Sequence, residues 1–230
     1  REPAEPALLP KYTPAQLAMG WIKRLLEPGM LGFAAIIFLY RWGDQMVATL
    51  LGPFLIDQGL DKEAIALMKG TVGSATSLLG ALLGGWLAFS TGRRTAVLVS
   101  GVAQAASYTS YIVAALGTGG VPLLWVATIF EGIIGTMATV ALFTLMMDAS
   151  DPEHAGTDYT LFASLVVVTG AIGNFTGGVL ADATGYATTF SAGTVVALLG
   201  TLAVVGILDR KPMPERVGLV WRKTSSPAQS

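Results

Sequence analysis

The chain has 230 residues, of which 53% are hydrophobic and only 13% are charged, with a net charge of -1. A soluble domain carries roughly a quarter charged residues, so this composition argues against an ordinary soluble protein, and the mean hydropathy of +0.62 agrees. The near-neutral charge gives no sign of a nucleic-acid partner. With no cysteine and a single histidine, His154, the sequence excludes disulfides, thiolate metal sites and histidine metal clusters within it. We expect no metal and no cofactor.

Apolar residues gather in six long blocks. About 20 mostly apolar residues cross a hydrocarbon core of about 30 Å, and each block reaches that length. The blocks cover residues 31–56, 70–90, 96–116, 121–147, 161–181 and 188–208. The strands of a membrane β-barrel would be about 10 residues long with alternating polarity, which this sequence lacks. The blocks predict an all-α membrane protein with a six-helix domain over residues 30–210, surrounded by the lipid bilayer.

Two flanking segments lie outside these blocks. Residues 1–29 are rich in proline and include an apolar and basic stretch at 16–26, which fits either an amphipathic helix on the cytoplasmic membrane face or a plain linker. Residues 211–230 also carry prolines and predict a flexible cytoplasmic tail. The sequence begins with Arg1 and no signal peptide follows, so we expect a fragment or a processed chain.

Positive charge near the ends of spans predicts which side faces the cytoplasm. With six spans, both termini share one side with the loops that follow the second and fourth spans. Eleven basic residues fall on that side, against Lys62 and Lys69 on the other. The eleven are Arg1, Lys11, Lys23, Arg24, Arg93, Arg94, Arg210, Lys211, Arg216, Arg222 and Lys223. This bias predicts that both termini are cytoplasmic.

The ends of the second and fifth blocks resemble each other. Residues 84–92 and 177–185 agree at six of nine positions at a constant offset of 93, and Gly80 matches Gly173 at the same offset. Each copy therefore opens with a pair of glycines four residues apart, a spacing that lets helix backbones approach closely. The match predicts a three-helix repeat, and because three is odd the second copy is inverted. Inverted three-helix repeats occur within each half of major facilitator transporters.

A glycine and arginine pattern carries a resemblance to that superfamily. Gly85, six further residues, and then Gly92, Arg93 and Arg94 resemble the loop between the second and third helices of a major facilitator half. This resemblance implies a cytoplasmic gate. The usual Asp-Arg pair of the pattern is replaced by Phe and Ser at positions 89 and 90, so the family's Asp-centred contact is not expected.

Four further runs resemble the C-terminal half of AmpG-like permeases. They are LYRWGD at 39–44, AQAAS at 103–107, MATVALFTLMMD at 137–148 and AGTDYTL at 155–161. The group includes muropeptide permeases, siderophore importers of the RhtX/FptX type and acetyl-CoA carriers, and the last two runs look nearest to the siderophore branch. The resemblance implies helices seven to twelve of a twelve-helix carrier, whose partner is an N-terminal six-helix half. It also implies proton-coupled import of a medium-sized polar solute, such as a siderophore or a muropeptide, through the bacterial inner membrane.

Ionisable groups inside a span are costly and are candidate functional residues. Arg41 and Asp44 are three residues apart and share a helix face, so they fit either substrate and proton handling or a structural ion pair. Glu131 lies in mid-span with no charge nearby in the sequence, which fits either a proton site or a hydrogen-bonded structural acid.

The third block carries a polar stripe, which fits either a cavity lining or hydrogen bonds between helices. Its members are Ser100, Gln104, Ser107 and Tyr111.

An acidic loop is expected from Asp148 to Asp158, on the same side as Arg93 and Arg94. We expect it either to form a charge contact between helices that opens and closes during transport, together with Tyr159, or to be merely solvated.

Rival interpretations are a membrane-embedded enzyme and a six-helix scaffold or partner subunit without transport activity. The sequence offers no metal cluster and no nucleophile with a histidine base, so we do not expect an enzyme. The scaffold remains open, because a carrier half can lose its activity.

Overall fold

The computed structural model describes residues 19–20, 22–23, 26, 28–152 and 154–209. The linker expected at 1–29 and the tail expected at 211–230 therefore lie almost wholly outside the described residues. Within the described part every regular element is helical. The elements are α2 (Pro28–Ala48), α3 (Leu51–Asp57), α4 (Lys62–Ala66), η1 (Leu67–Val72), α5 (Gly73–Thr91), α6 (Arg93–Ala115), α7 (Gly120–Ala149), α8 (Ala155–Thr184) and α9 (Tyr186–Asp209).

Five helices of the described chain are long and apolar enough to cross a membrane. They cover Lys62–Thr91, Arg93–Ala115, Gly120–Ala149, Ala155–Thr184 and Tyr186–Gly206, and they contain all but at most the last one or two residues of each of the second to sixth blocks of the sequence. The expected all-α membrane architecture is therefore confirmed. The first block differs, because the polar residues Arg41, Asp44 and Gln45 interrupt its apolar run.

The first block was also expected to form one helix over residues 31–56, and this was wrong. The helix stops at Ala48, a turn covers Thr49 and Leu50, and α3 begins at Leu51. Pro53 gives the physical reason. Proline has no N–H, so the carbonyl of Thr49 lacks the partner four residues on that a continuous helix would supply.

The second span is one 30-residue helix, Lys62–Thr91, assembled from α4, η1 and α5. The element η1 is a single π-helical turn that contains Lys69 and Gly70. Lys69 therefore lies within the helix. The count of loop charges in the sequence had placed it in a loop. A π-turn of this kind inside an α-helix is frequent at functional sites.

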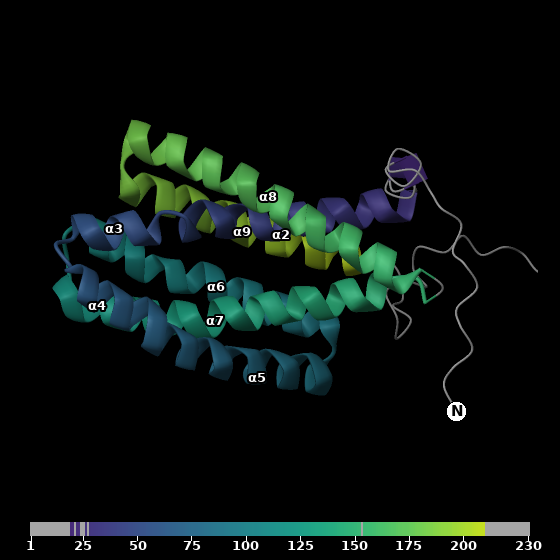
Figure 1. Cartoon of the computed structure of the whole chain (residues 1–230), viewed down its shortest axis with the longest axis horizontal. Coiled ribbons are helices and arrows are strands. Elements are labelled where there is room, and N and C mark those ends of the chain that lie inside the picture. The colour runs from purple at the N-terminus through teal and green to yellow at the C-terminus, as the bar shows by residue number, and fades with distance from the viewer. Residues whose placement is uncertain (1–18, 21, 24–25, 27, 153, 210–230) are drawn as a thin grey trace, which may run out of the picture.

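The long helices run side by side in two groups (Figure 1). In one group α5 packs against α7, and in the other α8 packs against α2, while α6 and α9 lie behind and contact each other across the middle. Buried side chains form two apolar clusters, one centred on Phe33, Leu145 and Phe162 and the other on Phe54 and Tyr111. The two groups thus share a rear wall of α6 and α9.

Glycines set the closest helix contacts at equivalent places in the two groups. A Cβ added to Gly84 on α5 would lie 2.9 Å from the carbonyl oxygen of Met137 on α7. A Cβ added to Gly177 on α8 would lie 2.5 Å from the carbonyl oxygen of Met46 on α2. Both distances are shorter than real Cβ contacts, so only glycine fits at either position. Gly84 and Gly177 are the first residues of the two similar nine-residue segments found in the sequence.

Large apolar side chains cover much of the outer surface. Trp86 and Phe89 on α5 are 64% and 87% exposed, and Phe175 on α8 is 72% exposed. Such exposure is unfavourable in water but is expected where a surface faces lipid tails or another apolar protein surface. The outer surface is therefore typical of a membrane protein.

The connection between α7 and α8 is shorter than expected. Asp148 lies in the last turn of α7, and Asp158 lies in the first turn of α8, where its side chain is only 1% exposed. The expected acidic loop from Asp148 to Asp158 was wrong in extent, because α8 begins at Ala155, six residues before the apolar block.

Candidate functional site

An ion pair lies in the C-terminal half of α2. Arg41 Nη1 is 2.5 Å from Asp44 Oδ2, and each side chain is 13% exposed. The two residues are three apart, so the helix brings them to one face. A nearly buried pair of this kind needs additional hydrogen bonds, because its mutual attraction alone does not offset the loss of hydration.

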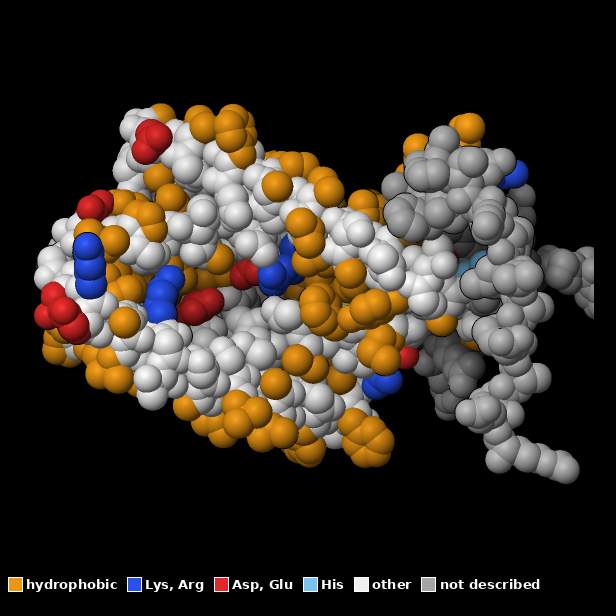
Figure 2. All heavy atoms as spheres, in the orientation of Figure 1, with side chains coloured by type: hydrophobic (Ala, Val, Ile, Leu, Met, Phe, Trp, Pro, Cys, Tyr) orange, Lys and Arg blue, Asp and Glu red, His pale blue; other side chains and the backbone are white. Residues whose placement is uncertain are grey.

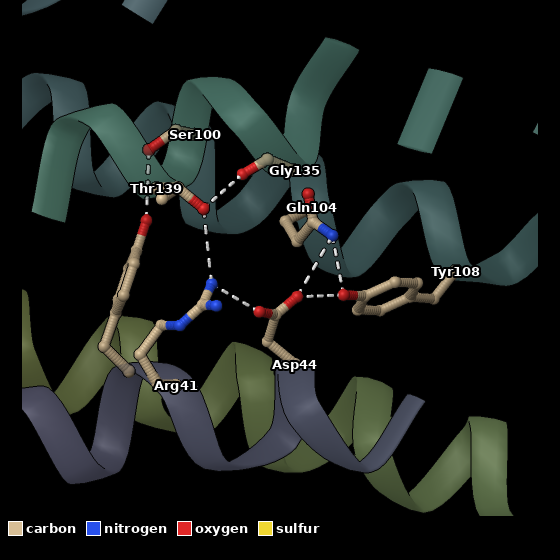
Figure 3. A network of polar contacts seen from close by, with 8 residues as sticks. Arg41, Asp44, Ser100, Gln104, Tyr108, Gly135 and Thr139 are labelled. Carbon is tan, nitrogen blue, oxygen red and sulfur yellow. Dashed lines mark hydrogen bonds and ion pairs between the residues drawn. The ribbon is translucent and has the colours of Figure 1, made fainter. Parts of the chain in front are cut away.

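Helix α6 supplies the additional hydrogen bonds to Asp44 (Figure 3). Gln104 Nε2 donates to Asp44 Oδ1 over 3.2 Å and to the Tyr108 hydroxyl over 2.6 Å. The Tyr108 hydroxyl in turn donates to Asp44 Oδ1. Asp44 therefore accepts from three side chains on two helices, which fixes its position and ties α2 to α6.

Arg41 has fewer of its hydrogen-bonding groups satisfied than Asp44 has. Arg41 Nη1 also approaches the Thr139 hydroxyl on α7 at 3.4 Å, a long contact. Its Nε atom is buried and has no hydrogen-bond partner among the described residues. Tyr40, the residue before Arg41, shares a hydrogen bond of 3.1 Å with Ser100 on α6. The guanidinium retains donor capacity that a bound acceptor could use.

Glu131 lies beside this network on α7. A Cβ placed on Gly135 would lie 3.2 Å from Glu131 Oε1 and 3.3 Å from Gln104 Oε1, so both oxygens border the same small space. The charged groups that interact electrostatically with Glu131 are Asp44 and Lys69, and Lys69 belongs to the π-turn η1. Asp44 and Glu131 thus belong to one polar cluster, although 87 residues separate them in the sequence.

The four residues of the polar stripe on α6 do not share one environment. Ser100, Gln104, Ser107 and Tyr111 are all buried. The Ser107 hydroxyl donates to the Gln104 carbonyl of its own helix. Tyr111 lies away from the ion pair, among Phe54 and Phe190, and shares a 3.1 Å hydrogen bond with Thr128. Of the stripe, only Gln104 contacts the ion pair.

The predicted gate residues meet at one end of the bundle. Arg93 Nε is 2.7 Å from Asp148 Oδ2, and Arg93 Nη1 donates to the Ala88 carbonyl at the end of α5. The pair joins the start of α6 to the end of α7. The structure therefore contains the expected contact between arginine and the acidic segment, while its part in opening and closing stays a prediction.

The remaining gate candidates have separate surroundings. Gly92 joins α5 to α6 with φ +85°, a conformation that favours glycine, whereas a Cβ on Gly85 would meet open space. Asp158 accepts a hydrogen bond of 3.0 Å from the backbone N–H of Asp151. Tyr159 packs against the apolar cluster of Phe33 and Phe162.

Charged side chains also gather on one face of the molecule. Figure 2 shows Lys, Arg, Asp and Glu side chains gathered in a hollow along the middle of the face that α2, α5, α7 and α8 present, with hydrophobic side chains on both sides. Charges inside a membrane protein normally face a polar interior or a water-filled path. The hollow is therefore the candidate functional site.

Several residues of this site were missed by reasoning from the sequence. Tyr108 and Thr139 have no distinguishing pattern, since single hydroxyl residues are common in apolar helices. Lys69 gave a weak signal, because it lies directly before the apolar block that begins at Gly70. Only the packing of α6 against both α2 and α7, and of η1 against α7, brings these residues to Asp44 and Glu131.

The family follows from comparison with known proteins. The model of the Major Facilitator Superfamily matches residues 33–229. The chain belongs to this superfamily. Its AmpG-like character is confirmed as well, since the chain is 26% identical over 171 residues to the anhydromuropeptide permease of Escherichia coli strain K12. That match covers 74% of this chain and 35% of the permease.

Two further relatives agree. A protein of Haemophilus influenzae that is named only as uncharacterized is 29% identical over 191 residues, which are 79% of this chain and 44% of that protein. A Rickettsia bellii protein named putative transporter AmpG 1 is 23% identical over 195 residues, which are 83% of this chain and 48% of that protein. The chain thus spans less than half the length of these relatives.

Proposed function

We propose that this chain is the C-terminal six-helix half of a proton-coupled secondary transporter that imports a medium-sized polar solute. The solute binds between this half and an N-terminal half of the same transporter, and the two halves rock about it. The observation that carries the proposal is the Arg41–Asp44 pair, which is nearly buried yet keeps an unused guanidinium donor, in a molecule whose one face is hollowed and lined by charged side chains. Because the chain belongs to a transporter superfamily, we interpret that hollow as part of a transport path.

In this proposal α2 and α3 together form the first span, which brings the number of spans to six, and the six are two inverted triplets. The matching glycine contacts of Gly84 with α7 and of Gly177 with α2 support the repeat. The backbones of Gly92 and Gly185 agree too, with φ/ψ of 85°/162° and 83°/171° at the two corresponding turns. An interrupted first helix also suits a transporter, because broken helices commonly border the binding site.

The membrane and its sidedness belong to the same proposal. We assign the protein to the bacterial inner membrane with both termini in the cytoplasm, supported by the basic residues at that end of the bundle. The Arg93–Asp148 pair, at 2.7 Å, then acts as a cytoplasmic gate between α6 and α7. Gly85, Arg94, Asp158 and Tyr159 belong to that gate as flanking residues.

For the solute, an anhydromuropeptide is the first candidate, because a relative bears the name anhydromuropeptide permease. A siderophore is the second, from the resemblance of residues 145–148 and 156–161 to importers of that kind. Both solutes carry acceptor oxygens that could pair with the guanidinium of Arg41, whose side chain is 13% exposed. Asp44 and Glu131 are the acids that would handle the coupled proton.

The test is uptake of labelled anhydromuropeptide and of an iron-loaded siderophore into cells that lack the gene and carry the full-length gene on a plasmid. We expect accumulation of one of them that collapses when the proton gradient is dissipated. A non-transporting scaffold would give uptake equal to the empty vector for both, and that result would overturn the proposal.

A further inference from the structure

Gln104 occupies a central position among the charged groups of the hollow. Its side chain is 3% exposed, and its Nε2 donates to Asp44 and to Tyr108. Both hydrogens of the amide nitrogen therefore point toward Asp44 and Tyr108. The amide oxygen on the other side, Oε1, is buried and has no hydrogen-bond partner among the described residues.

A buried acceptor without a donor is costly, typically about 1–3 kcal/mol. The surroundings of Gly135 indicate a candidate donor for Gln104 Oε1, namely a protonated Glu131. A Cβ there would lie 3.3 Å from Gln104 Oε1 and 3.2 Å from Glu131 Oε1, so the absence of a side chain at Gly135 leaves the two oxygens bordering one space. Two acceptors that border one space attract each other only when one carries a proton.

The surroundings of Glu131 bear on which form it takes. The titratable groups that interact with it are Asp44 on α2, Lys69 on η1, and Tyr108 and Tyr111 on α6. Asp44 repels a second negative charge, whereas Lys69 favours one. Opposing influences of this kind allow both protonation states of Glu131.

We propose that Gln104 is the positioning residue that couples the protonation of Glu131 to the Arg41–Asp44 pair. This inference rests on the proposed transport function. Protonated Glu131 donates its hydroxyl to Gln104 Oε1, and this contact keeps the amide N–H groups on Asp44 and Tyr108. When Glu131 loses its proton to the aqueous side of the hollow, its carboxylate accepts only, so the amide turns to donate to it.

The turned amide withdraws a donor from Asp44 and presents Oε1 to it. Asp44 then depends on Tyr108 and Arg41 alone, and the ion pair loosens. The protonation state of Glu131 on α7 thereby changes the hydrogen bonds of Asp44 on α2 through the neutral side chain of Gln104 on α6. Because the amide cannot satisfy both acids at once, the link acts as a two-position switch.

The test compares Gln104→Met with Gln45→Met in the full-length protein. The first removes the amide between Asp44 and Glu131 at nearly constant volume. The control removes an amide one residue from Asp44 whose side chain lies against Gly173 on α8. The first readout is the infrared C=O stretching band of protonated Glu131, assigned by its loss in Glu131→Gln.

We expect the band to move to higher frequency in Gln104→Met, because the acid hydroxyl loses its acceptor, and to stay in place in Gln45→Met. The second readout is transport of anhydromuropeptide. Accumulation driven by an imposed pH gradient should fall about fivefold or more in Gln104→Met, on the scale of typical coupling energies. Exchange of the solute without a gradient should persist.

The outcomes separate the two proposals. An unmoved band in Gln104→Met overturns the coupling role of Gln104, whether or not the protein transports the solute. Loss of exchange and of gradient-driven accumulation in equal measure assigns Gln104 to solute binding or to folding, and also overturns that role. Gly135→Ala gives an independent check, because its methyl group fills the shared space and should shift the same band.

Discussion

Arg93 on α6 and Asp148 on α7 form an ion pair across 2.7 Å, and the same arginine donates to the last turn of α5. One side chain therefore holds three helices together at a single end of the bundle. The pair is partly exposed, at 36% and 19%. Its contribution to stability is accordingly small, about 1 kcal/mol or less, which suits a contact that must break and re-form.

We predict that Asp148→Asn lowers uptake much more than it lowers stability, because the gate loses its closed contact while the fold keeps its core. Exchanging the charges, with Arg93→Asp and Asp148→Arg together, should recover part of the uptake. The measurements are initial rates of uptake and the thermal unfolding midpoint in detergent. Ser90→Ala is the control, since its exposed hydroxyl bonds only its own helix, at Leu87. Full activity of Asp148→Asn would contradict a gating role.

The glycine contacts give a test of packing with a built-in control. Gly177→Ala places a methyl group against the backbone of Met46, and we expect a loss of about 1–3 kcal/mol, as for other overpacked sites. Gly178→Ala meets open space and should be neutral or stabilising by up to about 1 kcal/mol, because alanine favours the helix. Detergent unfolding of the two variants compares them directly. Equal stabilities would mean that α8 and α2 do not pack as closely as described.

Sidedness can be measured by chemical labelling, since the chain has no cysteine of its own. Thr91 is the last residue of α5 and Thr118 follows α6, and both are exposed. The ends of these two helices lie at opposite ends of the bundle. In a cysteine-free full-length background, a membrane-impermeant maleimide should label Thr118→Cys in intact cells. It should label Thr91→Cys only after the cells are permeabilised. The reverse pattern would place the termini outside.

The sequence predicted the helices well because each membrane span corresponds to a long run of apolar residues. It also pointed to Arg41, Asp44, Glu131 and Gln104, since polar groups stand out against an apolar background. It did not predict the break at Thr49, although Pro53 carried the signal, because apolar length outweighed it. Neither could it place Glu131 near Asp44, which depends on how α6 packs against both α2 and α7.

The sequence also left open whether the α2 pair is functional or merely structural, and a double variant separates these. Asp44→Asn leaves the Arg41 charge nearly buried without its partner, so we expect a loss of about 3–5 kcal/mol, as for other broken buried pairs. Adding Arg41→Gln removes the orphaned charge and should restore most of the stability, measured by unfolding in detergent. Uptake, however, should stay abolished in the double variant, because the donor and the acid that handle solute and proton are both gone. Restored uptake with restored stability would assign the pair a structural role only. Glu131→Gln completes the comparison, since it should abolish accumulation while leaving the pair intact.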